Sequence, residues 1–208
     1  MNKHFIYNIF SSIPRFETEH LLLRRMKVED AEDMFEYACS AEVTRYLTWN
    51  PHADVPNTRE YLTYVQKQYE EGEFYNWALI YKPDMKMIGT CGFTSFDDDN
   101  NSAEIGYVVN PAYQDRGLAT EAVKEVIAFG FQKLGLNRIE AKYIEGNEAS
   151  RRVMEKCGMS YEGTHRSALL IKGEYKTISV CALLRDEFLT SHKESASPTF
   201  AWDKNGAL

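Results

Sequence analysis

The chain has 208 residues, of which 44% are hydrophobic, so it is long enough to form one domain with a sizeable core. Its formal net charge of −7 argues against a general nucleic-acid partner, which needs a basic face, and favours cationic substrates such as amines. No apolar run approaches the roughly 18 residues of a membrane span, and segment 1–16 lacks the apolar core of a signal peptide.

The first half of the chain is predicted to alternate between strands and helices. Apolar residues at helical spacing indicate helices over 28–40 and 58–72, the second ending at Gly72. A loop rich in helix breakers is expected at 51–57. Strands are expected at 19–26, 75–82, 86–96 and 103–109. Short turns join the last three strands, which we therefore expect to be antiparallel.

The second half opens with a long helix over 117–134, which carries one broad apolar stripe. A strand over 138–144 follows, and then a short helix over 147–158 that is capped by Asn147. Two strands at 167–171 and 177–184 form a final hairpin. The strand–helix–strand order predicts one parallel crossover within a mixed sheet, an α/β (α+β) architecture.

The long helix starts at an unusual turn, Gln114-Asp115-Arg116-Gly117-Leu118-Ala119. Helix N-termini present free N–H groups and a partial positive charge, so they bind anions. Gly117 lets a phosphate approach the backbone, and Arg116 adds a charged contact. The turn therefore predicts a phosphate site, although a helix start bent at a glycine explains the same six residues.

Two segments within 103–163 carry a resemblance: AEIGYVVNPAYQDRGLATEAVKEVIAFGF and NRIEAKYIEGNEASRRVMEKCGMSYEG. They resemble the GNAT superfamily of acetyl-CoA-dependent N-acetyltransferases, more narrowly its RimJ/RimL-type branch. The resemblance implies a mostly antiparallel central sheet of about seven strands flanked by about four helices. We expect a single acetyltransferase domain over 16–190, preceded by an N-terminal extension (1–15) and followed by a polar, mobile tail (191–208).

The resemblance also implies where acetyl-CoA binds. The backbone of Tyr107, Val108 and Val109 pairs with the pantetheine arm, in a slot made by a splay between strands 103–109 and 138–144. The pyrophosphate lies on the turn formed by Gln114, Asp115, Arg116, Gly117, Leu118 and Ala119. Asn147 contacts the pantetheine, and Ser150 lies near the sulfur.

Transfer of acetyl to an amine requires a deprotonated amine and a stabilised thiolate leaving group. Glu104 is the predicted base, acting directly or through water, and a solvated strand carboxylate is the alternative. Ser150 is predicted to donate a hydrogen bond to the thiolate, although a helix cap followed by a filler serine also explains Asn147 and Ser150. We expect direct attack in a ternary complex, because Cys157 has no evident base partner for an acyl-enzyme.

The acceptor is predicted less sharply than the co-substrate. Trp49 lies where the family builds its acceptor wall, so Trp49 and Glu104 are predicted to contact substrate, whereas Trp77 is expected in the core. The RimJ/RimL resemblance favours a protein N-terminal α-amine, and a small-molecule amine or antibiotic is the alternative. A non-catalytic acyl-CoA-binding module and a general nucleotide-phosphate binder are further alternatives.

The remaining expectations concern metals, compartment and assembly. The four cysteines have neither C-x-x-C nor zinc-finger spacing, so we expect no metal site. Their pattern is that of reduced thiols in a cytoplasmic protein. A monomer and a homodimer both fit the sequence.

Overall fold

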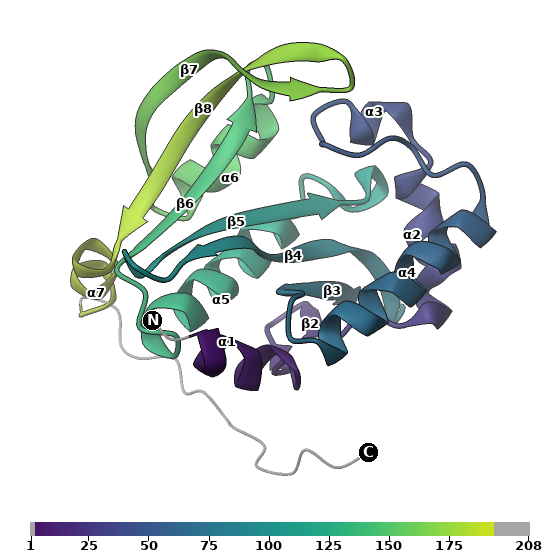
Figure 1. The fold of residues 1–208 in the computed structure, drawn as a ribbon, viewed down its shortest axis with the longest axis horizontal. Helices are drawn as coiled ribbons and strands as arrows, with labels where there is room; N and C mark the ends of the chain where they lie inside the picture. Colours follow the sequence, from purple (N-terminus) through teal and green to yellow (C-terminus); the bar gives the residue numbers. More distant parts are fainter. Residues whose placement is uncertain (1–2, 194–208) are drawn as a thin grey trace.

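One mixed sheet organises the chain, as Figure 1 shows for residues 3–193, which the computed structural model describes. Its strands are β1 (Phe16–Glu17), β2 (Leu21–Arg24), β3 (Asn76–Tyr81), β4 (Lys86–Asp97), β5 (Ser102–Val109), β6 (Arg138–Ile144), β7 (Ser160–Ile171) and β8 (Glu174–Leu184). Their spatial order is β1-β2-β3-β4-β5-β6-β8-β7. Among these strands only β5 and β6 pair in parallel, which confirms the predicted mixed sheet. The eighth strand is β1, which is too short to leave a pattern in the sequence.

Helices cover both faces of the sheet (Figure 1). They are α1 (Lys3–Phe10), α2 (Ala31–Ala38), α3 (Ala41–Thr44), α4 (Val55–Glu70), α5 (Leu118–Gln132), α6 (Glu148–Lys156) and α7 (Arg185–Lys193). Residues of α5 and α1 share one hydrophobic core, and residues of α2 and α4 share the other. The sequence predicted about four helices, and the additional ones within the described residues are α1, α3 and α7.

Strand β2 shows how the two cores are separated. Leu21 and Leu23 pack into the core on the α5 side, whereas Leu22 packs into the core on the α2–α4 side. A run of three buried leucines forms because both faces of this strand are covered. For the same reason the segment has no alternation of apolar and polar residues.

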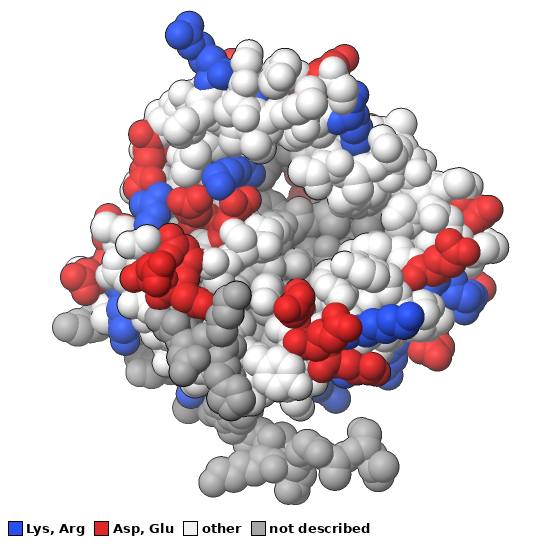
Figure 2. Space-filling view, in the orientation of Figure 1, with Lys and Arg blue, Asp and Glu red and all other residues white. Residues whose placement is uncertain are grey.

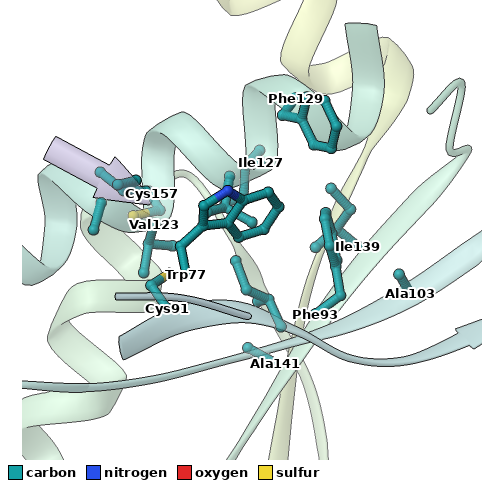
Figure 3. Close-up of a cluster of buried hydrophobic side chains, with 14 of the residues drawn as sticks. Trp77, Cys91, Phe93, Ala103, Val123, Ile127, Phe129, Ile139, Ala141 and Cys157 are labelled. Carbon is teal, nitrogen blue, oxygen red and sulfur yellow. The ribbon is translucent and has the colours of Figure 1, made fainter. Parts of the chain in front are cut away.

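The core on the α5 side is drawn in Figure 3, where Trp77 lies at the centre of the cluster. Trp77 is fully buried, and its Nε1 donates a hydrogen bond to the carbonyl oxygen of Pro14 at 2.6 Å. Phe93 and Phe129 meet the indole edge-on, with ring centroids 6.4 and 5.8 Å away. Each such pair contributes about 0.5–1.5 kcal/mol beyond its buried area. The prediction that Trp77 belongs to the core is confirmed.

Two predicted boundaries were wrong. Helix α4 begins at Val55 inside the expected loop, because Asp54 caps it by accepting from the amide of Asn57 at 2.8 Å, and proline is tolerated in a first turn. Strand β7 begins at Ser160, well before the predicted residue 167. This strand lies at the sheet edge and is mostly exposed, so burial imposes no alternation on its sequence.

Both ends of the described range, residues 3–193, contribute to the fold. Within segment 1–15, which the resemblance does not cover, residues 3–10 form α1, and Ile6 and Phe10 are buried in the core on the α5 side. The ring of Phe10 lies 5.7 Å from that of Trp77. At the other end, helix α7 runs to Lys193 and so includes residues 191–193 of the predicted 191–208 tail, whereas residues 194–208 lie outside the described residues.

Candidate active site

Strands β5 and β6 separate along their length and leave a slot between them. Their parallel pairing runs from Ser102 and Arg138 to Ile105 and Ala141. Beyond this point the edge of β5 that faces β6 has no partner strand among the described residues, while β6 continues to pair with β8. Figure 1 shows the two strands diverging, and Figure 2 shows this face of the molecule hollowed at its centre. The opening is the splay that the family resemblance implies.

The turn before α5 presents free amides at one end of this slot. Its first intrahelical hydrogen bond runs from the Glu121 amide to the Gly117 carbonyl at 2.9 Å, so the amides of the four residues before Glu121 have no intrahelical acceptor. Gly117 has a φ of 79°, a left-handed conformation that favours glycine. A Cβ built at Gly117 meets no atom within 4 Å, so the space beside this backbone is open. An anion can therefore reach the amides directly.

Two side chains of the turn are engaged within the turn itself. Gln114 Nε2 donates to the Val109 carbonyl at 3.2 Å, which ties the turn to the end of β5. Arg116 donates to the Ala112 carbonyl at 3.0 Å and lies over the ring of Tyr113 at 5.2 Å. Arg116 therefore contacts its own turn in this structure, and the open space beside Gly117 is reached by the backbone amides.

The first turn of α6 lies across the slot from β5. Asn147 caps this helix by accepting from the Ser150 amide at 3.2 Å, as predicted. The hydroxyl of Tyr107 reaches the same helical turn, 2.9 Å from Ser150 Oγ and 3.0 Å from the Ser150 carbonyl oxygen. Burial raises the pKa of Tyr107 well above its ordinary value, although the Ser150 contact opposes the shift. The structure thus brings together three predicted residues and gives the Tyr107 side chain a role that its strand pattern does not reveal.

Glu104 lies on the opposite face of β5 from Tyr107. Its carboxylate accepts from Lys142 Nζ at 2.6 Å, and the same Nζ lies 3.2 Å from Glu140. Partial burial disfavours the ammonium charge, but the hydrogen bonds to the two carboxylates outweigh it and raise the pKa of Lys142. Lys142 was not predicted, although alternation along parallel β6 puts it on the same face as Glu104.

An open cavity of about 330 Å³ is lined by charged side chains, Arg138, Glu140, Lys142 and Glu162, and Glu104 is connected to it through its ion pair with Lys142. Arg138 bridges the carboxylates of Glu140 at 3.0 Å and Glu162 at 2.5 Å. Glu104, Glu140 and Glu162 thus share two cations, Lys142 and Arg138, which leaves this group with one net negative charge. Figure 2 shows acidic side chains, with basic ones beside them, at the rim of the hollow.

The far end of the slot is bridged by the end of α3 and the residues that follow it. Tyr46 donates its hydroxyl to the Gly146 carbonyl at 3.2 Å, and Lys172 donates to the Thr44 carbonyl at 2.6 Å. These contacts tie the α3 region to the β6–α6 loop and to the β7–β8 hairpin, which the sequence did not predict. Trp49, three residues after Tyr46, packs on the α2–α4 core with its ring 5.4 Å from that of His52. None of these contacts connects Trp49 with Glu104.

Cys157, the only cysteine considered as a nucleophile, is buried, and its thiol donates weakly to the Thr120 carbonyl at 3.7 Å. Burial raises the pKa of its thiol to about 12, which disfavours the reactive thiolate. Among residues 3–193 no group of His, Cys, Asp and Glu side chains is arranged to hold a metal ion. No helix within these residues is both long enough and apolar enough to cross a membrane.

The sequence profile of a family described as "Acetyltransferase (GNAT) domain" matches residues 20–160. The N-acetyltransferase p20 of Bacillus licheniformis is 36% identical, over 82% of this chain and 96% of that protein. YdaF of Bacillus subtilis, a candidate ribosomal N-acetyltransferase, is 29% identical over 82% of this chain and 94% of its own. A spermidine N(1)-acetyltransferase of Escherichia coli is 26% identical over 82% of this chain and 89% of its own.

Solved structures give the same fold. A GNAT-family acetyltransferase from Bacillus anthracis superimposes with a TM-score of 0.74 at 28% identity, covering 84% of this chain and all of that one. RimL, a ribosomal L7/L12 α-N-protein acetyltransferase in complex with coenzyme A, gives a TM-score of 0.71 at 19% identity. It covers 84% of this chain and 99% of its own, and at this identity it supports the fold alone. The predicted family and fold class are confirmed.

Proposed function

Since this chain belongs to the GNAT family of N-acetyltransferases, which use acetyl-CoA, we propose that it acetylates the N-terminal α-amine of a protein. The amine attacks directly in a ternary complex with the co-substrate. Acetyltransfer to an amine follows from the family, whereas the choice of acceptor and the role of each residue are our inference.

We place acetyl-CoA in the slot between β5 and β6. The unpaired edge of β5 at Tyr107, Val108 and Val109 offers backbone groups to the pantetheine arm. Within the Gln114–Ala119 turn, the amides of Gly117, Leu118 and Ala119 have no intrahelical acceptor and are suited to the diphosphate, whereas the Gln114 amide donates to the Pro111 carbonyl at 3.2 Å. Asn147 lies at the opposite wall. When bound there, the co-substrate supplies an acetyl thioester whose sulfur leaves as a thiolate.

Glu104 is positioned to receive the proton that the attacking amine must lose. It faces the cavity side of the sheet, whereas Tyr107 and Ser150 lie on the α5 side, so base and thiol-side groups flank the opening from opposite faces. Lys142 forms an ion pair with the Glu104 carboxylate in this structure. The ammonium group of an incoming substrate competes with Lys142 for the same carboxylate oxygens. The carboxylate accepts the proton directly or through one water.

The observation that carries the choice of acceptor is the balance of charge around the cavity. The three carboxylates already share two cations, so the group has one net negative charge to offer. One negative charge matches a single ammonium better than a polyamine. An α-amine also has a pKa near 8, against about 10.4 for an alkylamine, which lowers the cost of deprotonation by roughly 3 kcal/mol.

The test is a panel of acceptors assayed by release of free thiol from acetyl-CoA. Short peptides with different first residues are compared with spermidine and with the same peptides blocked at the N-terminus but carrying an internal lysine. We expect the free α-amine peptides to show the highest kcat/KM and the blocked peptides to be inactive. A higher kcat/KM for spermidine, whose acetylation is the activity named for the E. coli relative, would refute the proposed acceptor.

The kinetic order is tested with the best acceptor of that panel. Direct attack predicts double-reciprocal plots that intersect when both substrates are varied. Parallel lines would indicate an acyl-enzyme and would contradict the proposed mechanism.

A further inference from the structure

Tyr107 makes a contact that its place on β5 does not require. It follows Ile105, the last β5 residue that pairs with β6, so its side chain lies where the two strands have separated. Its hydroxyl spans the opening and reaches the first turn of α6, 43 residues further along the chain. A phenylalanine would fill the same volume, so packing alone does not account for the hydroxyl.

The hydroxyl of Tyr107 carries one proton and has two acceptors within reach. These are Ser150 Oγ at 2.9 Å and the Ser150 carbonyl oxygen at 3.0 Å. If Tyr107 donates to the carbonyl, the Ser150 hydroxyl donates to the tyrosine oxygen, and the Ser150 proton is then not available to a group in the slot. If Tyr107 donates to Ser150 Oγ, the proton of Ser150 is free to point into the slot.

A negative charge in the slot selects the second arrangement. Hydrogen bonds to an ionised group are about twice as strong as neutral ones, so a thiolate draws the Ser150 proton toward itself. Tyr107 then donates to Ser150 Oγ and supports that orientation. Since burial keeps Tyr107 protonated, it contributes a hydrogen bond and gives up no proton.

We propose that Tyr107 is a positioning residue whose hydroxyl turns the Ser150 hydroxyl toward the sulfur of coenzyme A. The proposal rests on the location of the co-substrate proposed above, with its sulfur beside Ser150. It does not depend on which amine is the acceptor. Glu104 acts on the amine from the other face of β5, so the two groups serve separate parts of the reaction.

Equilibrium binding gives a readout that does not involve turnover. The affinities of coenzyme A and acetyl-CoA are measured by calorimetry from about pH 6.5 to about pH 9.5, across the ordinary thiol pKa of about 8.5. A donor aimed at sulfur stabilises the thiolate, so coenzyme A should gain affinity over acetyl-CoA as the pH rises, by about tenfold for each unit by which the thiol pKa is lowered. Tyr107→Phe should reduce this gain and leave acetyl-CoA affinity within about threefold.

Turnover is measured with whichever amine the wild-type protein acetylates. Tyr107→Phe should lower kcat about tenfold, the effect of one hydrogen bond, with little change in KM for acetyl-CoA. Ser150→Ala should cause at least the same loss. Because Tyr107 acts through Ser150, the double variant should be no worse than Ser150→Ala alone.

Tyr69→Phe is the matched control. Tyr69 is also a buried tyrosine, and its hydroxyl both donates and accepts a hydrogen bond. It donates to the Asn76 carbonyl at 2.6 Å and accepts from the Met26 amide at 3.2 Å. Its loss should lower the Tm and leave kcat and the pH dependence of coenzyme A binding unchanged.

Three outcomes would overturn the proposal. They are an unchanged kcat in Tyr107→Phe, an unchanged pH dependence of coenzyme A affinity, and a loss that adds in full to that of Ser150→Ala. A failure of peptides as acceptors would instead refute the proposed acceptor and leave Tyr107 testable with the amine that works. Loss of acetyl-CoA binding in Tyr107→Phe, without loss of folding, would assign the hydroxyl to co-substrate binding.

Discussion

The proposed diphosphate site can be tested with two glycines in the same backbone conformation. Gly117 and Gly135 have φ values of 79° and 71°, and a Cβ added at either meets no atom within 4 Å. Gly117 precedes α5 at the slot, whereas Gly135 lies in the loop after α5. Gly117→Ala and Gly135→Ala therefore impose a similar backbone strain, but only the first adds a methyl group beside the amides of the turn.

The expected change in stability follows from the conformation alone. Placing a residue other than glycine in the left-handed conformation lowers the free energy of unfolding by about 1–2 kcal/mol. Replacing glycine by alanine also reduces the entropy of the unfolded chain, which raises the free energy of unfolding by about 0.4–1 kcal/mol. Each variant should thus be destabilised by about 1 kcal/mol, which lowers the Tm of a chain of this length by about 2–4 °C. Since neither Cβ clashes, no larger loss is expected.

The affinity for acetyl-CoA should separate the two variants. The added methyl group keeps the diphosphate from the amides, and the loss of one charge-assisted hydrogen bond, about 1.5–3 kcal/mol, weakens binding tenfold or more. Gly135→Ala should bind acetyl-CoA like wild type in the same calorimetric titration. Equal affinities for the two variants would refute the assignment of the diphosphate to the Gln114–Ala119 turn.

Three further predictions concern the base, the cysteines and one hydrogen-bonded carboxylate. Glu104→Gln should lower kcat by about 10²–10⁴ with unchanged acetyl-CoA affinity, measured by thiol release and calorimetry. Alkylation of the folded protein near pH 8 should modify exposed Cys39 and spare Cys157, as read by peptide mass spectrometry, and Cys157→Ala should stay active. Glu121 accepts from the His20 backbone amide at 2.8 Å and from its ring at 2.9 Å, so Glu121→Gln should destabilise the protein by roughly 1 kcal/mol at neutral pH in urea unfolding.

The last prediction has a defined pH dependence. Partial burial opposes ionisation of Glu121, but its hydrogen bonds from Thr18 and His20 outweigh this and lower its pKa below the ordinary 4.5. A lowered folded-state pKa stabilises the protein above about pH 4.5, and this contribution is lost as the pH falls through the folded pKa. The gap between wild type and Glu121→Gln should therefore close in acid.

Each of these predictions has an outcome that would contradict it. Full activity in Glu104→Gln would remove this carboxylate from the mechanism. Rapid alkylation of Cys157 in the folded state would mean that the thiol is accessible and would reopen an acyl-enzyme route. A stability gap for Glu121→Gln that widens below pH 4.5 would reverse the sign derived from its hydrogen bonds.

Features that depend on neighbours in the chain were predictable from the sequence. Strand β6 has the predicted bounds 138–144, because alternation of side chains is a property of the strand itself. The cap at Asn147 and the helix start at Gly117 were placed correctly, because capping satisfies amides within a few residues. The family was identified from the same kind of local pattern, residues in a fixed order and spacing.

Features that join distant segments were decided only by the tertiary structure. The contact of Tyr107 with Ser150 and the ion pair of Glu104 with Lys142 each span about 40 residues. The identity of a tyrosine or a glutamate does not indicate which distant residue it will contact. The packing of Phe10 against Trp77 likewise depends on where the sheet leaves a face uncovered. Alternation along a strand fixes which side chains share a face, but only the arrangement of strands and helices decides what that face meets, because burial and pairing are properties of the assembled layers.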